Sequence, residues 1–161
     1  MDPLSISASV AGLVTLATTI VGSGSAYITS VREFPKELEN LLCETHRLNT
    51  ILQQIAEFVQ ATTGGSTTTL KKLSEIITPQ AIHKADTLLK SVKTMLEGCQ
   101  QVHGARGKNS VKAIIWPFKE REAKTTLEEF RRLATTLDQA INVDSRYQIV
   151  ISTSSMFKHW G

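Results

Sequence analysis

Residues 3–31 of this chain contain no charged side chain, and this feature limits what the N-terminal segment can form. A stretch of that length suits a membrane span, the apolar part of a signal peptide or a core helix of a soluble bundle. A signal peptide begins with basic residues, whereas Asp2 stands in that place here. Ten serines and threonines make the stretch only moderately apolar for a membrane span. The sequence therefore favours a core helix that is buried on most of its circumference at rest.

Apolar residues within this stretch recur at steps of three and four, which is typical of one face of an α-helix. Asp2 suits the N-cap of that helix, and Pro3 suits its first helical position. The apolar stripe comprises Ile6, Val10, Leu13, Ala17, Ile20, Gly24, Tyr27 and Val31. The opposite face, called the small-residue face below, comprises Ala8, Ala11, Gly12, Thr15, Thr18, Thr19, Gly22, Ala26 and Thr29. Surface helices usually carry lysine and glutamate at such positions, so this face is atypical.

The rest of the chain continues the helical pattern and predicts an all-α fold, a helical bundle of about five helices. Further helices are expected over 35–61, over a short segment at 70–77, over 79–102, and from 116–117 to about 142. The linkers at 62–69 and 103–110 are rich in small or polar residues. The expected inward positions are Leu38, Leu41, Leu42, Leu48, Ile51, Leu52, Ile55, Phe58, Ala85, Leu88, Leu89, Val92, Leu96, Cys99, Ala123, Leu127, Phe130, Ala134, Leu137 and Ile141.

Residues 145–161 form a C-terminal tail of different character. Its segment YQIVIST is rich in β-branched residues and carries no charge, which favours a strand or another extended conformation. We therefore expect a β-prone tail, extended or disordered, after a single bundle domain of residues 1–144.

Composition argues against several function classes. The net charge is +3 with only two tryptophans and two tyrosines, which is too little for a nucleic-acid-binding surface. Cys43 and Cys99 suit reduced thiols of a cytosolic protein. Cys43 and His46 stand three residues apart, but no set of four convergent ligands follows, so no metal site and no cofactor is expected. The sequence has no nucleophile motif and no phosphate-binding loop, so the chain is not expected to be an enzyme.

A local excess of basic residues lies before and after Glu120 and Glu122. The members of this basic region are Arg106, Lys108, Lys112, Lys119, Arg121 and Lys124. One interpretation is a solvated loop and helix start. The other is contact with anionic lipid headgroups, where each basic residue near the surface contributes about 1 kcal/mol. Trp116 and Phe118 suit either the protein core or the membrane interface.

The small-residue face also allows a second state of the first helix. Serine and threonine are tolerated in lipid because their hydroxyls bond the backbone of their own helix. Small residues four positions apart let two helices pack closely in a membrane. The pairs of this kind are Ala8/Gly12, Thr15/Thr19, Thr18/Gly22 and Gly22/Ala26.

Three segments resemble a known family. They are MDPLSISASVAGLVTLA, then VREFPKELENLLCETHRLNTILQQI, then LEGCQQVH followed by IIWPFKEREAKTTLEEFRRLATTLDQAINVD. In this order they resemble the fungal N-terminal domain of STAND proteins, the NLR-like receptors, which is also called the HeLo-like domain. The most specific stretch is Trp116, Pro117, Phe118, Lys119 and Glu120. The resemblance covers residues 1 to about 144.

The resemblance implies an all-helical fold, similar to the HeLo domain of fungal incompatibility toxins and to the four-helix executioner domain of the mixed-lineage kinase-like pseudokinase. Some HeLo-like members permeabilise membranes and kill the cell when an amyloid motif or an attached receptor clusters them. Their N-terminal helix is the membrane-active element. Carried over to this chain, that role falls on Leu4, Ile6, Val10, Leu13, Leu16, Ile20 and Val21.

The expected function is a signalling or cell-death effector domain of fungal innate immunity or heterokaryon incompatibility, cytoplasmic at rest and membrane-associated on activation. The implied partners are further copies of the chain, membrane lipids, and an NLR-like receptor or an amyloid-signalling partner. The tail lacks the glycine-bearing pattern of described fungal amyloid motifs, so it is either a divergent motif or an unrelated end of a longer receptor. The alternative function is a non-toxic homotypic interaction or adaptor module of a STAND receptor, whose first helix never leaves the bundle.

Overall fold

The computed structural model describes residues 3–31, 35–62, 74–75, 77–106 and 120–157, with side chains described over 4–31, 35–61, 74–75, 77–101 and 121–142. This part of the chain contains the helices α1 (Pro3–Ser30), α2 (Lys36–Thr62), α4 (Pro79–Arg106) and α5 (Glu120–Phe157), and no strand. The all-α bundle is confirmed, with four long helices where the sequence predicted about five. The short helix expected at 70–77 lies largely outside the described residues, of which Ser74 and Glu75 are helical.

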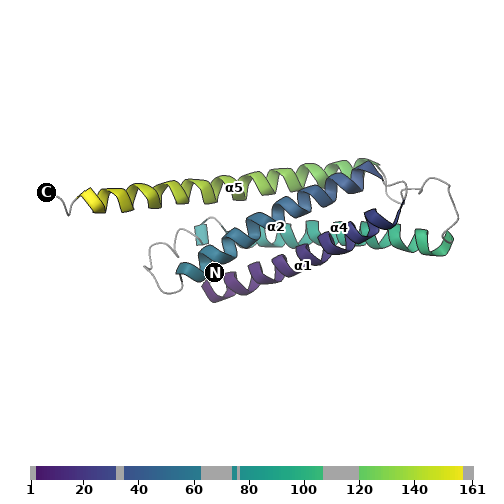
Figure 1. Ribbon diagram of the computed structural model, residues 1–161, viewed down its shortest axis with the longest axis horizontal. Helices are drawn as coiled ribbons and strands as arrows, with labels where there is room; N and C mark the ends of the chain where they lie inside the picture. The colour runs from purple at the N-terminus through teal and green to yellow at the C-terminus, as the bar shows by residue number, and fades with distance from the viewer. Residues whose placement is uncertain (1–2, 32–34, 63–73, 76, 107–119, 158–161) are drawn as a thin grey trace.

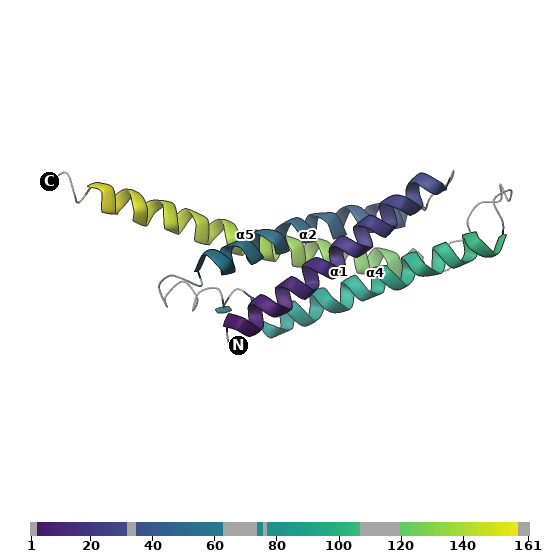
Figure 2. The same ribbon diagram turned by 60° about the horizontal axis from the view of Figure 1, so that its bottom comes forward.

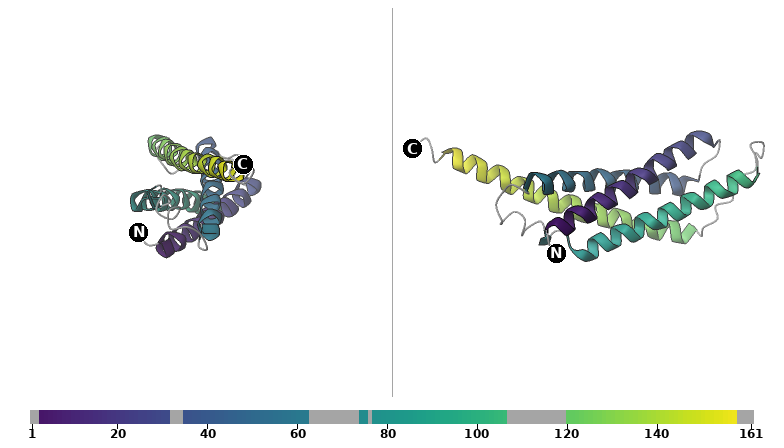
Figure 3. Two further views of the ribbon diagram at one scale, coloured as in Figure 1. Left: turned by 90° about the vertical axis from the view of Figure 1, so that its left-hand side faces the viewer. Right: turned by 90° about the horizontal axis from the view of Figure 1, so that it is seen from below.

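The four helices form an elongated antiparallel bundle. α1 and α4 run in one direction, whereas α2 and α5 run in the opposite direction (Figure 1). α1 packs against α2 and α4, and α5 packs against the same two helices from the other side (Figure 3). α1 and α5 therefore occupy opposite corners of the bundle, and each has one side that no other described helix covers.

Proline stands at three of the helix starts: α1 begins at Pro3, as the sequence predicted, α2 directly after Pro35, and α4 at Pro79. The Pro35 carbonyl accepts hydrogen bonds from the backbone N–H groups of Leu38 and Glu39, at 3.1 and 3.2 Å, and so opens α2. Thr78 caps α4 because its hydroxyl accepts from the Ala81 N–H at 3.2 Å, and Pro79 is the first helical residue. Proline suits that position because its missing N–H would have no partner within the helix.

The predicted core is confirmed. The α1 stripe from Ile6 to Tyr27 is buried, and Phe130 of α5 is fully buried at the centre of the bundle. The expected inward positions of α2, α4 and α5 are buried, except Phe58, Leu127 and Ile141, which are half-buried against the core. The sequence missed the buried residues Val59, Met95 and Leu133.

The expected burial of α1 on most of its circumference is wrong. Only 28% of its most apolar 18-residue stretch is buried, and every member of the small-residue face is exposed. The reason is position, because a corner helix touches two neighbours and leaves its outer side in water.

The extended conformation expected for the tail is wrong over residues 145–157, where α5 continues as one helix to Phe157. Its C-terminal part runs past the ends of the neighbouring helices (Figure 2). No glycine or proline occurs between Glu120 and Phe157, so nothing stops a helix that has already nucleated on the bundle. The domain boundary at residue 144 stays a prediction. Residues 103–106 of the polar loop expected at 103–110 belong to α4, and 107–110 lie outside the described residues.

One glycine of α1 has a packing role that the others lack. A Cβ at Gly24 would lie 2.5 and 2.6 Å from the two terminal methyl carbons of Leu42 and 3.1 Å from its Cγ. A Cβ at Gly12 or Gly22 would meet no atom within 4 Å. The close approach of α1 to α2 therefore depends on Gly24.

We predict opposite effects for two alanine substitutions in α1. Gly24→Ala should lower the free energy of unfolding by about 1 kcal/mol, because overpacking against Leu42 outweighs the gain in helix propensity. Gly22→Ala should raise it by about 0.5–1 kcal/mol, because it adds only helix propensity. Urea unfolding followed by circular dichroism measures both. The same sign for the two variants would contradict the packing described here.

Candidate functional site

The exposed side of α1 is the most unusual surface of the described chain. The helix spans about 42 Å at the α-helical rise per residue, longer than the roughly 30 Å hydrocarbon core of a bilayer. It is the helix of the described residues that is long and apolar enough to cross a membrane. Core helices and signal sequences have the same length and composition, so the corner position of α1 is what makes its exposed face notable.

Several hydroxyls of α1 donate to backbone carbonyls of the same helix. Ser9 donates to the Ser5 carbonyl at 2.8 Å, Thr15 to the Ala11 carbonyl at 3.0 Å and Thr19 to the Thr15 carbonyl at 2.9 Å. These bonds do not depend on water, so they persist in an apolar medium. Exposed threonines of the other helices make the same bond, as Thr136 does on α5. The feature that sets α1 apart is therefore its lack of charge.

Most of the side chains predicted to be membrane-active face the bundle core. Ile6, Val10, Leu13 and Ile20 are between 1% and 5% exposed. Leu16 and Val21 are half-buried, whereas Leu4 is 79% exposed. The structure thus places this set on the packed side of α1, and it places the small-residue face on the outer side. Contact between these buried residues and lipid requires α1 to leave its place.

Hydrogen bonds between described residues join α1 to α2 and to α4. The Asn49 side-chain amide of α2 donates to the Thr18 hydroxyl at 3.2 Å. Asn49 is 7% exposed, and its Oδ1 is buried with no hydrogen-bond partner among the described residues. Leaving a buried acceptor unpaired costs about 1–3 kcal/mol. This contact fixes the register of α1 on α2 without adding much stability.

The second contact is buried and links α1 to α4. The Tyr27 hydroxyl donates to the backbone carbonyl of Cys99 at 3.2 Å. Burial raises the pKa of the Cys99 thiol to about 11, so the thiol is neutral at physiological pH. Burial, with a smaller effect from a Cys99 thiolate, also raises the pKa of Tyr27. The sequence predicted both residues as inward-facing, but it carried no signal that they would meet.

Ion pairs join α5 to α2 and to α4 on the side of the bundle opposite α1. Glu44 of α2 accepts a hydrogen bond from Arg131 of α5 at 3.1 Å, and its other oxygen lies 3.6 Å from Arg47. Lys84 of α4 lies 4.0 Å from Glu129 of α5. α1 cannot form such pairs, because it has no charged side chain.

The basic region is described only in part. Arg121 and Lys124 are exposed in the first turns of α5, and Arg106 is the last residue of α4. Lys108, Lys112 and Lys119 lie outside the described residues, as do Trp116, Pro117 and Phe118, and Glu120 begins α5. The C-terminal end of α4 and the N-terminal end of α5 lie at the end of the bundle opposite the N-terminus of α1 (Figure 1).

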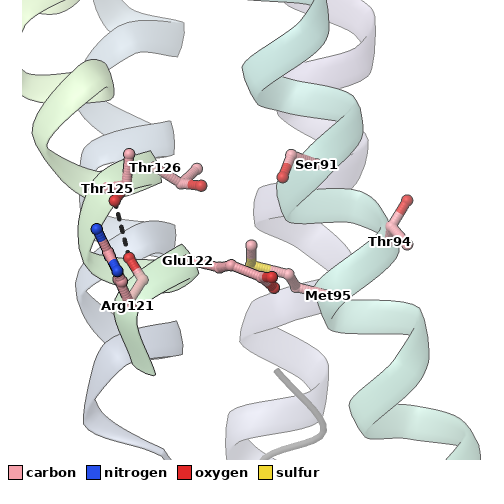
Figure 4. A pocket seen from close by; sticks show the side chains of 7 residues that line it. All are labelled: Ser91, Thr94, Met95, Arg121, Glu122, Thr125 and Thr126. Atoms are coloured by element: carbon pink, nitrogen blue, oxygen red, sulfur yellow. Dashed lines mark hydrogen bonds between the residues drawn. The ribbon is translucent and has the colours of Figure 1, made fainter. Parts of the chain in front are cut away.

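An open groove of about 530 Å³ lies beside Arg121, between α4 and α5. Its lining residues are Ser91, Thr94, Met95, Arg121, Glu122, Thr125 and Thr126. In Figure 4 the Glu122 side chain reaches across from α5 toward Met95, and the Thr125 hydroxyl donates to the Arg121 carbonyl at 2.9 Å. The groove combines one charge of each sign with scattered hydroxyls, so it favours no ligand class.

Metal-binding side chains do not converge in the described part of the chain. No group of three or more histidine, cysteine, aspartate or glutamate residues is placed to hold an ion there. Cys43 is exposed and Cys99 is buried, and both are free thiols.

We predict that Cys99 makes the fold less stable at high pH. Above pH 9.0 the unfolded chain loses the thiol proton, whereas the folded chain keeps it until about pH 11. The folded state then binds more protons, so the free energy of unfolding falls across this window, by up to about 2 kcal/mol. Urea unfolding at pH 8.5 and 10.5 should show a smaller fall for Cys99→Ala than for the unmodified chain. Equal falls would contradict the prediction.

Comparison with known proteins gives one match. Residues 1–78 match the family model described as the pigment biosynthesis cluster protein PigL N-terminal domain, just under half of the chain. The matched part contains α1 and α2, and thus the small-residue face and the Gly24–Leu42 contact. No curated protein and no solved structure matches the chain. The N-terminal part of the chain is therefore similar to the N-terminal helical domain of that family.

Proposed function

We propose that this chain is a membrane-active signalling domain, a cell-death effector of fungal innate immunity of the HeLo-like type. Clustering of copies would release α1, which would then associate with or permeabilise a membrane. The observation that carries the proposal is α1 itself, a surface helix with one apolar stripe in the core and no charge on its exposed side. The resemblance to HeLo-like domains supplies the biological setting.

The packing of α1 against the core opposes its release into water. Moving Ile6, Val10, Leu13 and Ile20 from the core into water costs roughly 1.5–3 kcal/mol for each side chain. In lipid these side chains remain in an apolar medium, so most of that cost disappears. Release is therefore favourable only where a membrane receives the helix, and clustering brings several helices to the same place.

The exposed side of α1 is suited to lipid as well as to water. A charged side chain at the centre of a spanning helix costs about 2.5–3.5 kcal/mol. The exposed sides of α2, α4 and α5 carry several charges each, whereas α1 carries none. Gly12 and Gly22 leave open space on this side, so released helices can approach one another closely.

The basic region supports docking in this scheme. Arg121 and Lys124 are exposed at one end of the bundle, near the C-terminal end of α4. Both side chains reach solvent while α1 is still packed, so anionic headgroups can approach them. The domain would be cytoplasmic at rest and bound to the membrane after activation, with copies of itself and an upstream receptor as partners.

The test compares two lysine substitutions at exposed threonines that make the same hydroxyl bond. Thr19→Lys places a charge on the exposed side of α1, and Thr136→Lys places one on α5. The full chain is fused to an inducible dimeriser, and dye release from anionic liposomes is measured. Thr19→Lys should lower release at least about tenfold, given the cost of a charge at mid-bilayer, whereas Thr136→Lys should release dye like the unmodified chain.

A chain lacking residues 1–31 serves as the inactive reference, and circular dichroism confirms that both lysine variants are folded. Equal release by the two lysine variants would refute insertion of α1. Absence of release from the clustered, folded, unmodified chain would favour the alternative, a non-toxic interaction module of a larger receptor.

A further inference from the structure

We infer that α1 opens from its N-terminal end, while its C-terminal half stays anchored to α2 and α4 through Tyr27 and Gly24. The order of opening is a property of the bundle alone. Its consequence at a membrane, described below, rests on the proposed release of α1.

Three described contacts that hold α1 against its neighbours lie between Thr18 and Tyr27. Tyr27 is 5% exposed, and its hydroxyl donates a hydrogen bond to the Cys99 carbonyl of α4. Gly24 lets the α1 backbone lie directly against Leu42 of α2. Thr18 accepts the Asn49 amide near the middle of the helix. A hydrogen bond and a close backbone contact both depend on position within a few tenths of an ångström, so they resist sliding and tilting.

The core beneath the N-terminal half of α1 contains a small void. A small apolar cavity of about 10 Å³ lies beneath Val10 and Leu13. Its other lining residues are Leu52, Ile55, Ile77, Ala81, Ile82, Ala85 and Leu137, which come from all sides of the bundle. Side chains that border a void lose dispersion contacts on that side. The hydroxyl bonds of Ser9 and Thr15 stay within α1 and do not tie it to a neighbour.

The first turn of α1 is also poorly covered. Leu4 is 79% exposed, the one large apolar side chain of the described residues that is exposed to this extent. Helix ends with little buried surface open at low free energy, and the opening then extends inward. The cavity below Val10 and Leu13 makes the next turns easier to open than the turns that contain Gly24 and Tyr27.

The position of the anchor limits what a half-open helix can do. Residues 3–16 span about 21 Å as a helix, which is shorter than the roughly 30 Å hydrocarbon core. With the turns from Thr18 to Tyr27 still packed, the freed half can lie in the membrane interface but cannot cross the bilayer. Crossing requires these anchored turns, including Tyr27, to leave the bundle as well, so binding and permeabilisation become two separate steps.

Hydrogen exchange of the unmodified full chain, without lipid, tests the order of opening. We expect backbone amides of residues 7–15 to exchange at least about tenfold faster than those of residues 18–28. Uniform protection along α1, or faster exchange in the C-terminal half, would overturn the inference. This measurement does not depend on whether the chain acts on membranes.

Two hydroxyl deletions then test the anchor. Tyr27→Phe should raise exchange at residues 20–28 by about fivefold, the effect of losing one net hydrogen bond. Thr19→Val removes a hydroxyl that bonds only its own helix, so it should leave these rates unchanged. An unchanged rate in Tyr27→Phe, or an equal rise in both variants, would refute Tyr27 as the anchor.

The same variants separate this inference from the proposed function. In the clustered liposome experiment, Tyr27→Phe should increase dye release while vesicle flotation shows unchanged binding. The exchange gradient without any dye release would keep the order of opening and refute membrane action. Dye release that needs α1, together with uniform exchange, would keep membrane action and refute the order of opening.

Discussion

The packing of one apolar stripe into the groove between α2 and α4 is the contact on which the rest of this structure depends. Ile6, Val10, Leu13 and Ile20 close the core on that side. The hydrophobic effect has no direction, so the same stripe is stable against protein or against lipid. Since α1 carries no charge, no ionised side chain keeps it at the aqueous surface. The buried stripe therefore supplies most of the hold on α1, while the Tyr27 bond, the Thr18 contact and the close approach at Gly24 fix its position.

On the side away from α1, buried apolar contacts and an ion pair hold α2, α4 and α5 together. Phe130 is fully buried, and Glu44 joins α2 to α5 through Arg131. α2, α4 and α5 also contact one another directly, so they can keep their arrangement when α1 moves. Departure of α1 would expose the apolar faces of α2 and α4. Such a surface favours association with other copies, which connects release of the helix to clustering in the proposed function.

The family match covers α1, the helix proposed to be released, and its neighbour α2. Residues 1–78 contain α1, α2 and the glycine that sets their distance, whereas α4, α5 and the basic region fall outside the match. The anchor of α1 therefore joins two parts of the chain, because Tyr27 lies within the match and Cys99 lies beyond it. The matched residues alone lack the α4 carbonyl that holds the C-terminal half of the helix.

The sequence by itself determined the helices of the bundle, their buried stripes and the absence of charge on α1, because hydrophobic periodicity and proline positions are local properties. It did not determine that α1 lies at a corner, since coverage depends on which helices become neighbours. It also gave no indication of the Tyr27–Cys99 and Arg131–Glu44 contacts, whose partners are 72 and 87 residues apart. The β-branched residues after 144 favoured an extended tail, but a helix already nucleated on the bundle continues through them to Phe157. Only the tertiary structure decided these features, because each one depends on what packing has already brought together.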